Sequence, residues 1–474
     1  MRSVNVLLAF VLGASAVITA GGCASTSKIG SWFGGSTYKL PAYEEKKLPN
    51  GLQVLYLPDN SLPYVSLSLM VKVGVVNDPA DVPGVSAMVA ELLDKGTTRR
   101  SAPKIAEDFG QIGADYEAYA STEYSMVTAS ALSTKADELL AYVHEVVTEP
   151  TFSDAEIERA RTRTLASLRR LEDNSRAFAD RAFNAFLFES HPYARPVSGT
   201  IKSVTNIRKK HIIQHYLRYY RPNNAILAVV GKYTPEFAAQ VQKMFGAWEQ
   251  REVPALELEG PQVVKGRQVL LVDKPGLVQA QVRVGHIGIE RQSEDFLAVR
   301  VANTILGGAY MSRLNNRVRI QLGLTYSIYS WFETFHKPGA FEISTFTKNE
   351  SVGQTVEEIL KVVSEFKKNG VTAEEVEAAK GYLKGVFPQA IETPEKLANS
   401  LLVLRFYGVP DSYLKNYLRD LDSLSVSAVN RAIKKHFDDE NIKIVVYANA
   451  KETRQQLQAL SDQFAEKKAR SFSE

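Results

Sequence analysis

Residues 84–97 read Gly-Val-Ser-Ala-Met-Val-Ala-Glu-Leu-Leu-Asp-Lys-Gly-Thr, and this stretch decides how the rest of the chain is interpreted. Its apolar residues predict a helix packed into a core. The glycine of the closing Lys-Gly-Thr is typical of a helix stop, because glycine adopts the left-handed conformation without strain. The stretch therefore predicts a buried helix with a defined end.

The rest of the chain reads as an α+β protein in which one order of elements occurs twice. In the first half, apolar patterns predict strands at 52–57, 65–73, 116–132 and 225–230, and helices at 104–112, 134–148, 154–171 and 211–217. In the second half, they predict strands at 269–272, 280–287, 325–332, 340–347 and 442–448, and helices at 296–305, 311–322, 356–368, 372–387 and 429–437. A repeat of this length predicts two homologous domains and not a solenoid.

The joint between the two domains is predicted at residues 251–266, which contain prolines, a glycine and alternating charges. This linker divides an N-terminal domain, residues 38–250, from a C-terminal domain, residues 267–474. The charged tail at 467–470 reads as a solvated end. Because the net charge of +4 is small for 474 residues, the composition gives no support for a nucleic-acid partner.

The first residues read as an export signal. Residues 1–22 contain Arg2, an apolar stretch and then small residues, a pattern typical of a signal peptide. Cys23 is the only cysteine and follows two glycines, which resembles a bacterial lipobox. We therefore expect a lipidated Cys23, a flexible tether over residues 23–37, and a lipoprotein of the bacterial cell envelope, at the outer membrane and facing the periplasm. The alternative is an ordinary secretory signal that contains a cysteine.

Residues 84–97 resemble the signature helix of the pitrilysin/insulinase metallopeptidases. In that family an inverted zinc motif, His-x-x-Glu-His, stands between an opening Gly-x-x and a closing Lys-Gly-Thr. The resemblance implies a half-clam of two homologous α/β-sandwich domains, covering about residues 40–460. It places the two histidines, the catalytic glutamate, the third zinc ligand and an accessory acid at Ala87, Glu91, Ala90, Ser167 and Ala160, in that order.

These residues do not supply the chemistry of zinc hydrolysis. A hydrolytic zinc needs three protein ligands and one open position for water. Of the five positions, only Glu91 carries a side chain that could touch a metal, and one carboxylate does not hold zinc. We therefore expect this chain to have no catalytic residue and no metal or other cofactor, and we expect zinc on a partner subunit.

A second motif of the same family is better preserved. Residues 303–327 resemble its C-terminal motif, in which an arginine and a tyrosine stand seven residues apart. Here they are Arg319, on the last turn of a predicted helix, and Tyr326, at the start of a strand, with Gly323 as the left-handed cap between them. The resemblance implies that this pair binds the substrate backbone beside the zinc. The alternative is that Arg319 pairs with a surface acid and Tyr326 packs in the core.

Residues 113–124 match the place of the family's edge strand, which binds extended peptides by strand addition. The sequence leaves two interpretations open for its tyrosines, since they could line a peptide groove or pack within the sheet. His211 and His215 share a helix face without an acid in that turn, so we interpret them as surface or internally bonded histidines.

Together these features predict a non-catalytic subunit of a pitrilysin/insulinase-type zinc peptidase. The resemblance implies a division of labour, in which one chain carries the zinc motif and this chain supplies Arg319 and Tyr326 to peptide substrates in a shared cavity. The expected partner is a zinc-bearing subunit of the same family in a heterodimer, with a homodimer as the alternative. The rival hypothesis is a peptide-binding or scaffold protein of the periplasm with no proteolytic role.

Overall fold

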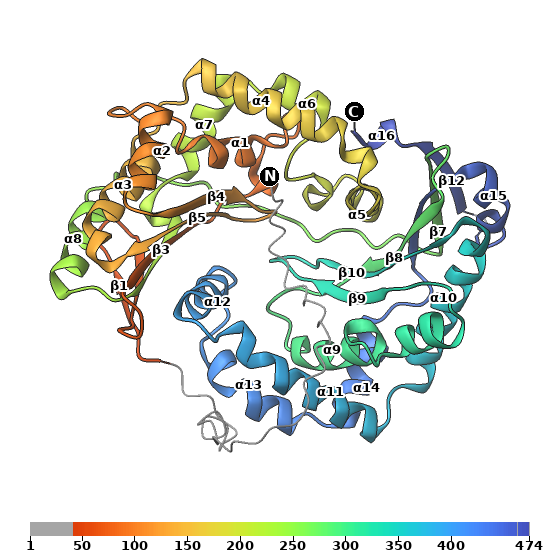
Figure 1. The fold of residues 1–474 in the computed structure, drawn as a ribbon. Coiled ribbons are helices and arrows are strands. Elements are labelled where there is room, and N and C mark those ends of the chain that lie inside the picture. The colour runs from red at the N-terminus through yellow and green to blue at the C-terminus, as the bar shows by residue number, and fades with distance from the viewer. Residues whose placement is uncertain (1–40, 462, 474) are drawn as a thin grey trace, which may run out of the picture.

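The structure, a computed structural model, describes residues 41–461 and 463–473. The expected signal peptide, Cys23 and the tether lie outside the described residues. The described part forms two six-stranded mixed sheets with helices packed on them (Figure 1). This architecture agrees with the α+β fold of two similar halves that the sequence predicts.

The first sheet has the order β1-β2-β6-β3-β5-β4. Its central strand β6 is buried at every residue, as expected for a strand covered on both faces. Its strands are β1 (Glu44–Lys47), β2 (Gln53–Pro58), β3 (Tyr64–Val71), β4 (Asp115–Ala120), β5 (Ser125–Leu132) and β6 (Ala225–Gly231).

The second sheet repeats this arrangement in the order β12-β7-β11-β8-β10-β9. The two sheets differ at one edge, since β1 pairs antiparallel with β2 whereas β12 pairs parallel with β7. The strands are β7 (Gln268–Asp273), β8 (Gln279–Ile287), β9 (Ile328–Glu333), β10 (Ala340–Lys348), β11 (Lys443–Ala448) and β12 (Gln463–Lys468). The other five strands of each sheet follow the same order, which confirms the repeat that the sequence predicts.

The helices of the first half gather mainly on the outer face of the first sheet (Figure 1). The start of α4 follows the sequence prediction, because the hydroxyl of Ser153 accepts a hydrogen bond from the Glu156 backbone amide. These helices are α1 (Val85–Leu92), α2 (Ala102–Gln111), α3 (Ala136–Thr148), α4 (Asp154–Arg169), α6 (Ile201–Asn206), α7 (Lys209–Tyr219) and α8 (Pro235–Gly246).

The helices of the second half form a corresponding layer beside the second sheet. Helix α11 starts with a capping box in which Thr372 and Glu375 bond to each other's backbone amides. The helices are α9 (Phe296–Asn303), α10 (Val352–Asn369), α11 (Ala373–Val386), α13 (Ser412–Ser423), α14 (Val426–His436), α15 (Ala450–Gln458) and α16 (Arg470–Ser473). None of the described helices combines the length and the hydrophobicity that a membrane span requires.

Two further helices cross between the halves, and the sequence did not predict them. Helix α5 (Ser175–Phe188) belongs to the first half but packs on β8 and β11 of the second sheet, where the rings of Phe178 and Tyr447 lie 4.5 Å apart. Helix α12 (Pro394–Phe406) belongs to the second half but packs on β2, β3 and β6 of the first sheet. Each half therefore completes the hydrophobic core of the other.

Three sequence-based predictions differ from the structure. The predicted helix at 311–322 is shorter and forms a π-helical turn at Asn315–Gln321. The strand predicted from residue 325 begins at Ile328, because the Thr325 hydroxyl bonds to the backbone of Ser327 and holds a turn there. Residues 467–468 belong to β12 instead of a solvated end, and their exposed charges suit an edge strand. Residues 251–265 contain no helix or strand.

Candidate functional site

Helices α1 and α4 pack against each other and carry the positions where the resemblance places the zinc chemistry. On α1, Ala87 is partly exposed, Ala90 is buried and Glu91 is partly exposed. On α4, Ala160 is buried and Ser167 is exposed. The two helices thus bring these positions to one place, but their alanine and serine side chains offer no set of zinc ligands.

The one carboxylate at this place is already bound by an arginine. The guanidinium of Arg163 donates from Nη2 and Nε to Oε1 of Glu91, at 2.7 and 3.0 Å. Because Arg163 lies one turn before Ser167 on α4, an ion pair joins the helices where the family's zinc would join them. No group of three potential metal ligands exists among the described residues. The site therefore does not fit a zinc ion.

The Arg319 motif differs from the α1–α4 site, because Arg319 has no acidic partner in the described chain and Tyr326 is exposed. Arg319 lies in the π-helical turn, a feature frequent at functional sites. Its guanidinium carbon lies 4.9 Å from the ring centroid of Tyr310, and it forms no ion pair with any described residue. Tyr326 is 81% exposed. Gly323 has a φ of +62°, which confirms the predicted left-handed cap.

The structural alternative drawn from the sequence does not describe this pair, since Arg319 has no acidic partner within the described chain and Tyr326 is not in the core. Sequence reasoning missed two neighbours, Tyr310 and Met311, which are 55% and 80% exposed. Both lie within the 303–327 motif, and no sequence signal showed that they are exposed. A role of the pair in substrate binding stays a prediction.

Comparison with known proteins identifies the family. Residues 53–201 match the family described as insulinase (peptidase family M16), and residues 206–383 match the peptidase M16 inactive domain. The chain belongs to the M16 peptidase family. This confirms the family membership that the resemblance of residues 84–97 predicted.

Relatives of this M16 chain include proteins named as zinc proteases and one named as a non-peptidase homologue. The chain is 25% identical to an uncharacterised zinc protease, YmxG, of Bacillus subtilis, covering 82% of this chain and 95% of that protein. It is also 25% identical to the non-peptidase homologue YmxG of Helicobacter pylori, covering 84% and 92%. A crystal structure of a peptidase M16 inactive domain from Pseudomonas fluorescens is 27% identical, with a TM-score of 0.80 over 86% of this chain and 98% of that one.

The beginning of α1 is fixed by a buried polar cluster that sequence reasoning missed. The carboxylate of Asp78 accepts hydrogen bonds from the backbone amides of Gly84 and Ser86, and from the Ser86 hydroxyl at 2.6 Å. Nε2 of His215, on α7, lies 3.0 Å from the same hydroxyl. Burial raises the pKa of Asp78 to about 7, opposed mainly by the Ser86 hydrogen bond, and lowers the pKa of His215 to about 3.

This cluster contains a serine, a histidine and an aspartate, but it does not have the arrangement of a hydrolase. In a catalytic triad the aspartate orients the histidine and the serine stands open to substrate. Here Asp78 bonds to Ser86 itself, lies 3.9 Å from His215 Nε2, and leaves Ser86 only 1% exposed. We therefore assign the cluster to the anchoring of α1. His215 is internally bonded, as the sequence interpretation allowed.

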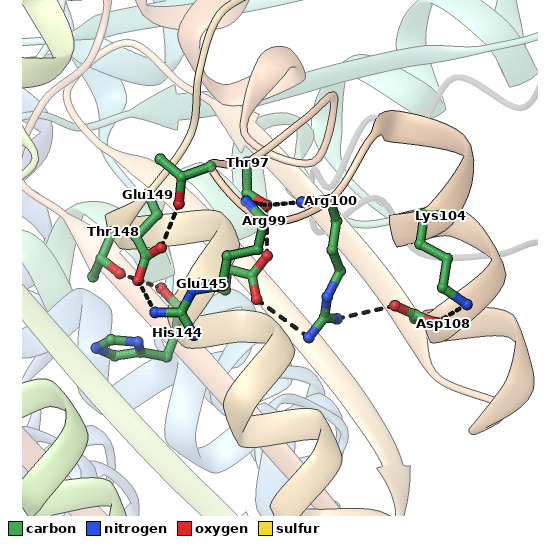
Figure 2. Close-up of polar contacts among 10 residues, drawn as sticks. Thr97, Arg99, Arg100, Lys104, Asp108, His144, Glu145, Thr148 and Glu149 are labelled. Atoms are coloured by element: carbon green, nitrogen blue, oxygen red, sulfur yellow. Dashed lines mark hydrogen bonds and ion pairs between the residues drawn. The ribbon is translucent and has the colours of Figure 1, made fainter.

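The turn that ends α1 is anchored to α3 by a second network (Figure 2). Thr97 donates from its hydroxyl to Glu145 at 2.5 Å, and Gly96 takes the left-handed conformation at φ +127°. Arg100 lies between two buried carboxylates, 3.2 Å from Glu145 and 3.1 Å from Asp108. The Lys-Gly-Thr segment thus has a structural role that does not depend on zinc.

The predicted edge strand is confirmed, since β4 pairs only with β5 among the described strands. Its tyrosines do not form an exposed row. The Tyr116 ring lies 4.9 Å from Phe109, the Tyr124 ring lies 5.4 Å from Phe406 of α12, and Tyr119 is partly buried against the core. Packing within the protein is therefore their main role.

Proposed function

We propose that this M16 chain is a non-catalytic subunit that supplies Arg319 and Tyr326 to peptides held together with a zinc-bearing partner of the same family. One contrast carries the proposal: the only carboxylate of the α1–α4 site is paired with an arginine, whereas Arg319 has no acidic partner in the described chain. An arginine without an acidic partner in the described chain can donate to a peptide carbonyl, and an exposed phenol can do the same.

The comparisons support the part of this proposal that says the chain is not itself a peptidase. The Helicobacter pylori relative is described as a non-peptidase homologue. In the proposed complex, zinc is bound by the partner, and hydrolysis of peptides takes place in the shared cavity. The residues of this chain bind and orient the substrate.

The test is co-expression with an M16 chain that carries His-x-x-Glu-His, followed by co-purification, metal analysis and peptide cleavage. Arg319→Gln should lower kcat/KM by about 10- to 100-fold, because an oriented charged hydrogen bond is lost, while the zinc content stays the same. Arg317→Gln is the matched control, since Arg317 is paired with Glu358 at 2.7 Å. Equal kinetics of the Arg319 variant and the parent complex would contradict the role of Arg319.

The same experiment distinguishes the proposed subunit from the rival hypothesis of a protein without a proteolytic role. A chain that forms no complex with a zinc-bearing partner, but binds peptides as a homodimer, would be a periplasmic binding or scaffold protein. The open edge of β4 is the feature that such binding would use.

We also propose that Cys23 is lipidated and holds the protein at the outer membrane, facing the periplasm. The support is the small-residue segment before Cys23, the only cysteine of the chain. Cells that express the chain should incorporate labelled fatty acid into it, and Cys23→Ser should abolish that label. A labelled Cys23→Ser variant would contradict the assignment.

A further inference from the structure

A cavity of about 650 Å³ lies in the second half, away from the Arg319 motif. Its walls come from the loop between β8 and α9, the first turn of α9, the turn after α12, and helices α13 and α14. The walls include the aromatic rings of Phe296, Tyr413 and Tyr417 and the aliphatic side chains of Val409 and Leu424. Its volume falls in the range of small-molecule sites.

One cationic side chain in this wall has no counter-ion. The guanidinium carbon of Arg291 lies 4.1 Å from the Phe296 ring centroid and 4.9 Å from that of Tyr413. Arg291 forms no ion pair with any residue in the described part of the chain. Burial lowers its pKa, the neighbouring Tyr413 phenol opposes this shift, and the Arg300 guanidinium adds to it. Its backbone amide donates to the Phe335 carbonyl at 2.8 Å, which fixes its position.

A second guanidinium, that of Arg300, lies close to Arg291 but does not line the cavity. Arg300 lies 5.4 Å from the Tyr417 ring centroid and also forms no ion pair within the described residues. Both guanidinium groups are partly buried and lie beside tyrosine rings instead of carboxylates. Burial lowers the pKa of Arg300, but Tyr417 and Tyr413 outweigh burial and raise it. Since burial of an unpaired charge is costly, an anion in the adjoining cavity would stabilise this arrangement.

The acidic residues of the cavity do not compensate for Arg291. Asp295 is bound by Lys435 at 2.8 Å and by His436 at 2.7 Å. Asp420 is bound by Arg419 at 3.0 Å. Glu294 and Arg431 also line the cavity, and both are exposed to solvent. Their charges are opposite in sign, so together they add no net charge to the wall.

We propose that this cavity binds a small organic anion, with its carboxylate or phosphate group on Arg291 and its apolar body against the aromatic wall. A guanidinium presents parallel N–H donors that match either anion. The rings of Phe296 and Tyr413 hold Arg291 in place and offer apolar surface to the rest of the ligand. The site is independent of the Arg319 motif and of the proposed partner.

The test uses the purified full-length chain and three probes: 4-phenylbutyrate, its neutral amide, and inorganic phosphate. Calorimetric titration should show saturable binding of 4-phenylbutyrate at about one per chain and at least tenfold weaker binding of the amide, because the charged contact is lost. Inorganic phosphate should bind more weakly than 4-phenylbutyrate because it lacks the apolar body. No saturable binding of 4-phenylbutyrate, or equal binding of the acid and its amide, would overturn the proposal.

Three variants locate the binding in the cavity. Arg291→Met should weaken 4-phenylbutyrate binding at least tenfold, whereas Arg218→Met, which removes an arginine stacked on Tyr219 that does not line this cavity, should not. Ala428→Trp should fill the cavity and block binding while Arg291 remains. Binding that is unchanged in both Arg291→Met and Ala428→Trp would place the ligand elsewhere and overturn the assignment.

Discussion

The α1–α4 face and the Arg319 segment are the two places to which the family resemblance assigns functional residues. At the α1–α4 face, small residues stand at most of the zinc positions, and the one carboxylate, Glu91, has its charge compensated by Arg163. In the Arg319 segment, the guanidinium of Arg319 has no ion-pair partner in the described chain and contacts only the Tyr310 ring, while Tyr326 is 81% exposed.

The difference teaches which parts of an M16 signature the fold itself requires. Helix α1 is held at its beginning by Asp78, Ser86 and His215, and at its end by the Thr97–Glu145 contact. These contacts would stabilise α1 with or without a metal ion. The Arg319 segment has no comparable set of hydrogen bonds or ion pairs on Arg319 and Tyr326 among the described residues, and the proposed role in peptide binding would account for these side chains.

The sharpest way to break this comparison is to rebuild the metal site. A variant with Ala87→His, Glu91→His and Ser167→Glu should bind zinc stoichiometrically, because it restores three ligands on two packed helices. Adding Arg163→Gln should raise the zinc affinity, since the guanidinium would otherwise repel the cation. Metal analysis after dialysis measures both effects. A folded variant without zinc would show that these positions do not correspond to the family's ligands.

The next largest effect concerns the network after α1. Glu145→Ala should lower the free energy of unfolding by about 3 kcal/mol, because Arg100 and Thr97 lose a buried partner. Chemical denaturation measures this change. Glu149→Ala is the matched control from the same end of α3, and it should cost about 1 kcal/mol or less because its contacts with Thr98 and Arg99 are more exposed. Equal losses would contradict the anchoring role.

The cluster before α1 predicts a pH-dependent effect. Unfolded His215 binds a proton below about pH 6.5, whereas the folded protein holds its pKa near 3. In the parent, the stability linked to neutral His215 is therefore lost as the pH falls through this window, by up to about 1.4 kcal/mol per pH unit. The destabilisation caused by His215→Asn should accordingly shrink as the pH falls from 6.5 to 4.

Asp78→Asn gives the opposite sign and serves as the control. Because the folded pKa of Asp78 is raised, the parent loses stability as the pH rises from about 4 to 7, so the cost of Asp78→Asn should shrink in that direction. Denaturation midpoints at several pH values measure both trends. Parallel pH profiles of the two variants would contradict the pKa shifts.

The smallest effect on stability is expected in the Arg319 segment. Arg319→Gln and Tyr326→Ala should each change the free energy of unfolding by less than about 0.5 kcal/mol, because surface substitutions away from packed contacts have small effects. Denaturant titration of the purified chain measures this. A loss above about 2 kcal/mol for either variant would assign the pair to the fold, since core truncations reach that size.

Several parts of the site were accessible to sequence reasoning and others were not. Ala87, Ala90 and Glu91 could be placed because they lie within one helix of fixed spacing. The ion pair of Glu91 with Arg163 could not, because the two residues stand 72 positions apart and meet only through helix packing. The clusters of Asp78 with His215 and of Thr97 with Glu145 were missed for the same reason.

The fold shows the same limit in α5 and α12. On α12 the apolar residues are distributed around much of the helix, so the helical periodicity that marks a surface helix is weak there. On α5 the buried residues Phe178, Phe183 and Leu187 do follow helical spacing. The local pattern could not show that either helix packs on the sheet of the other half.

The sequence by itself determined the family, the repeated order of strands and helices, and the absence of zinc ligands at the signature positions, because these depend on residue type and local spacing. Only the tertiary structure decided which helix covers which sheet, which charges find partners, and that Arg319 and Arg291 find no carboxylate in the described chain. The physical reason is that packing and charge compensation join residues from distant segments, and no local pattern specifies where those segments meet.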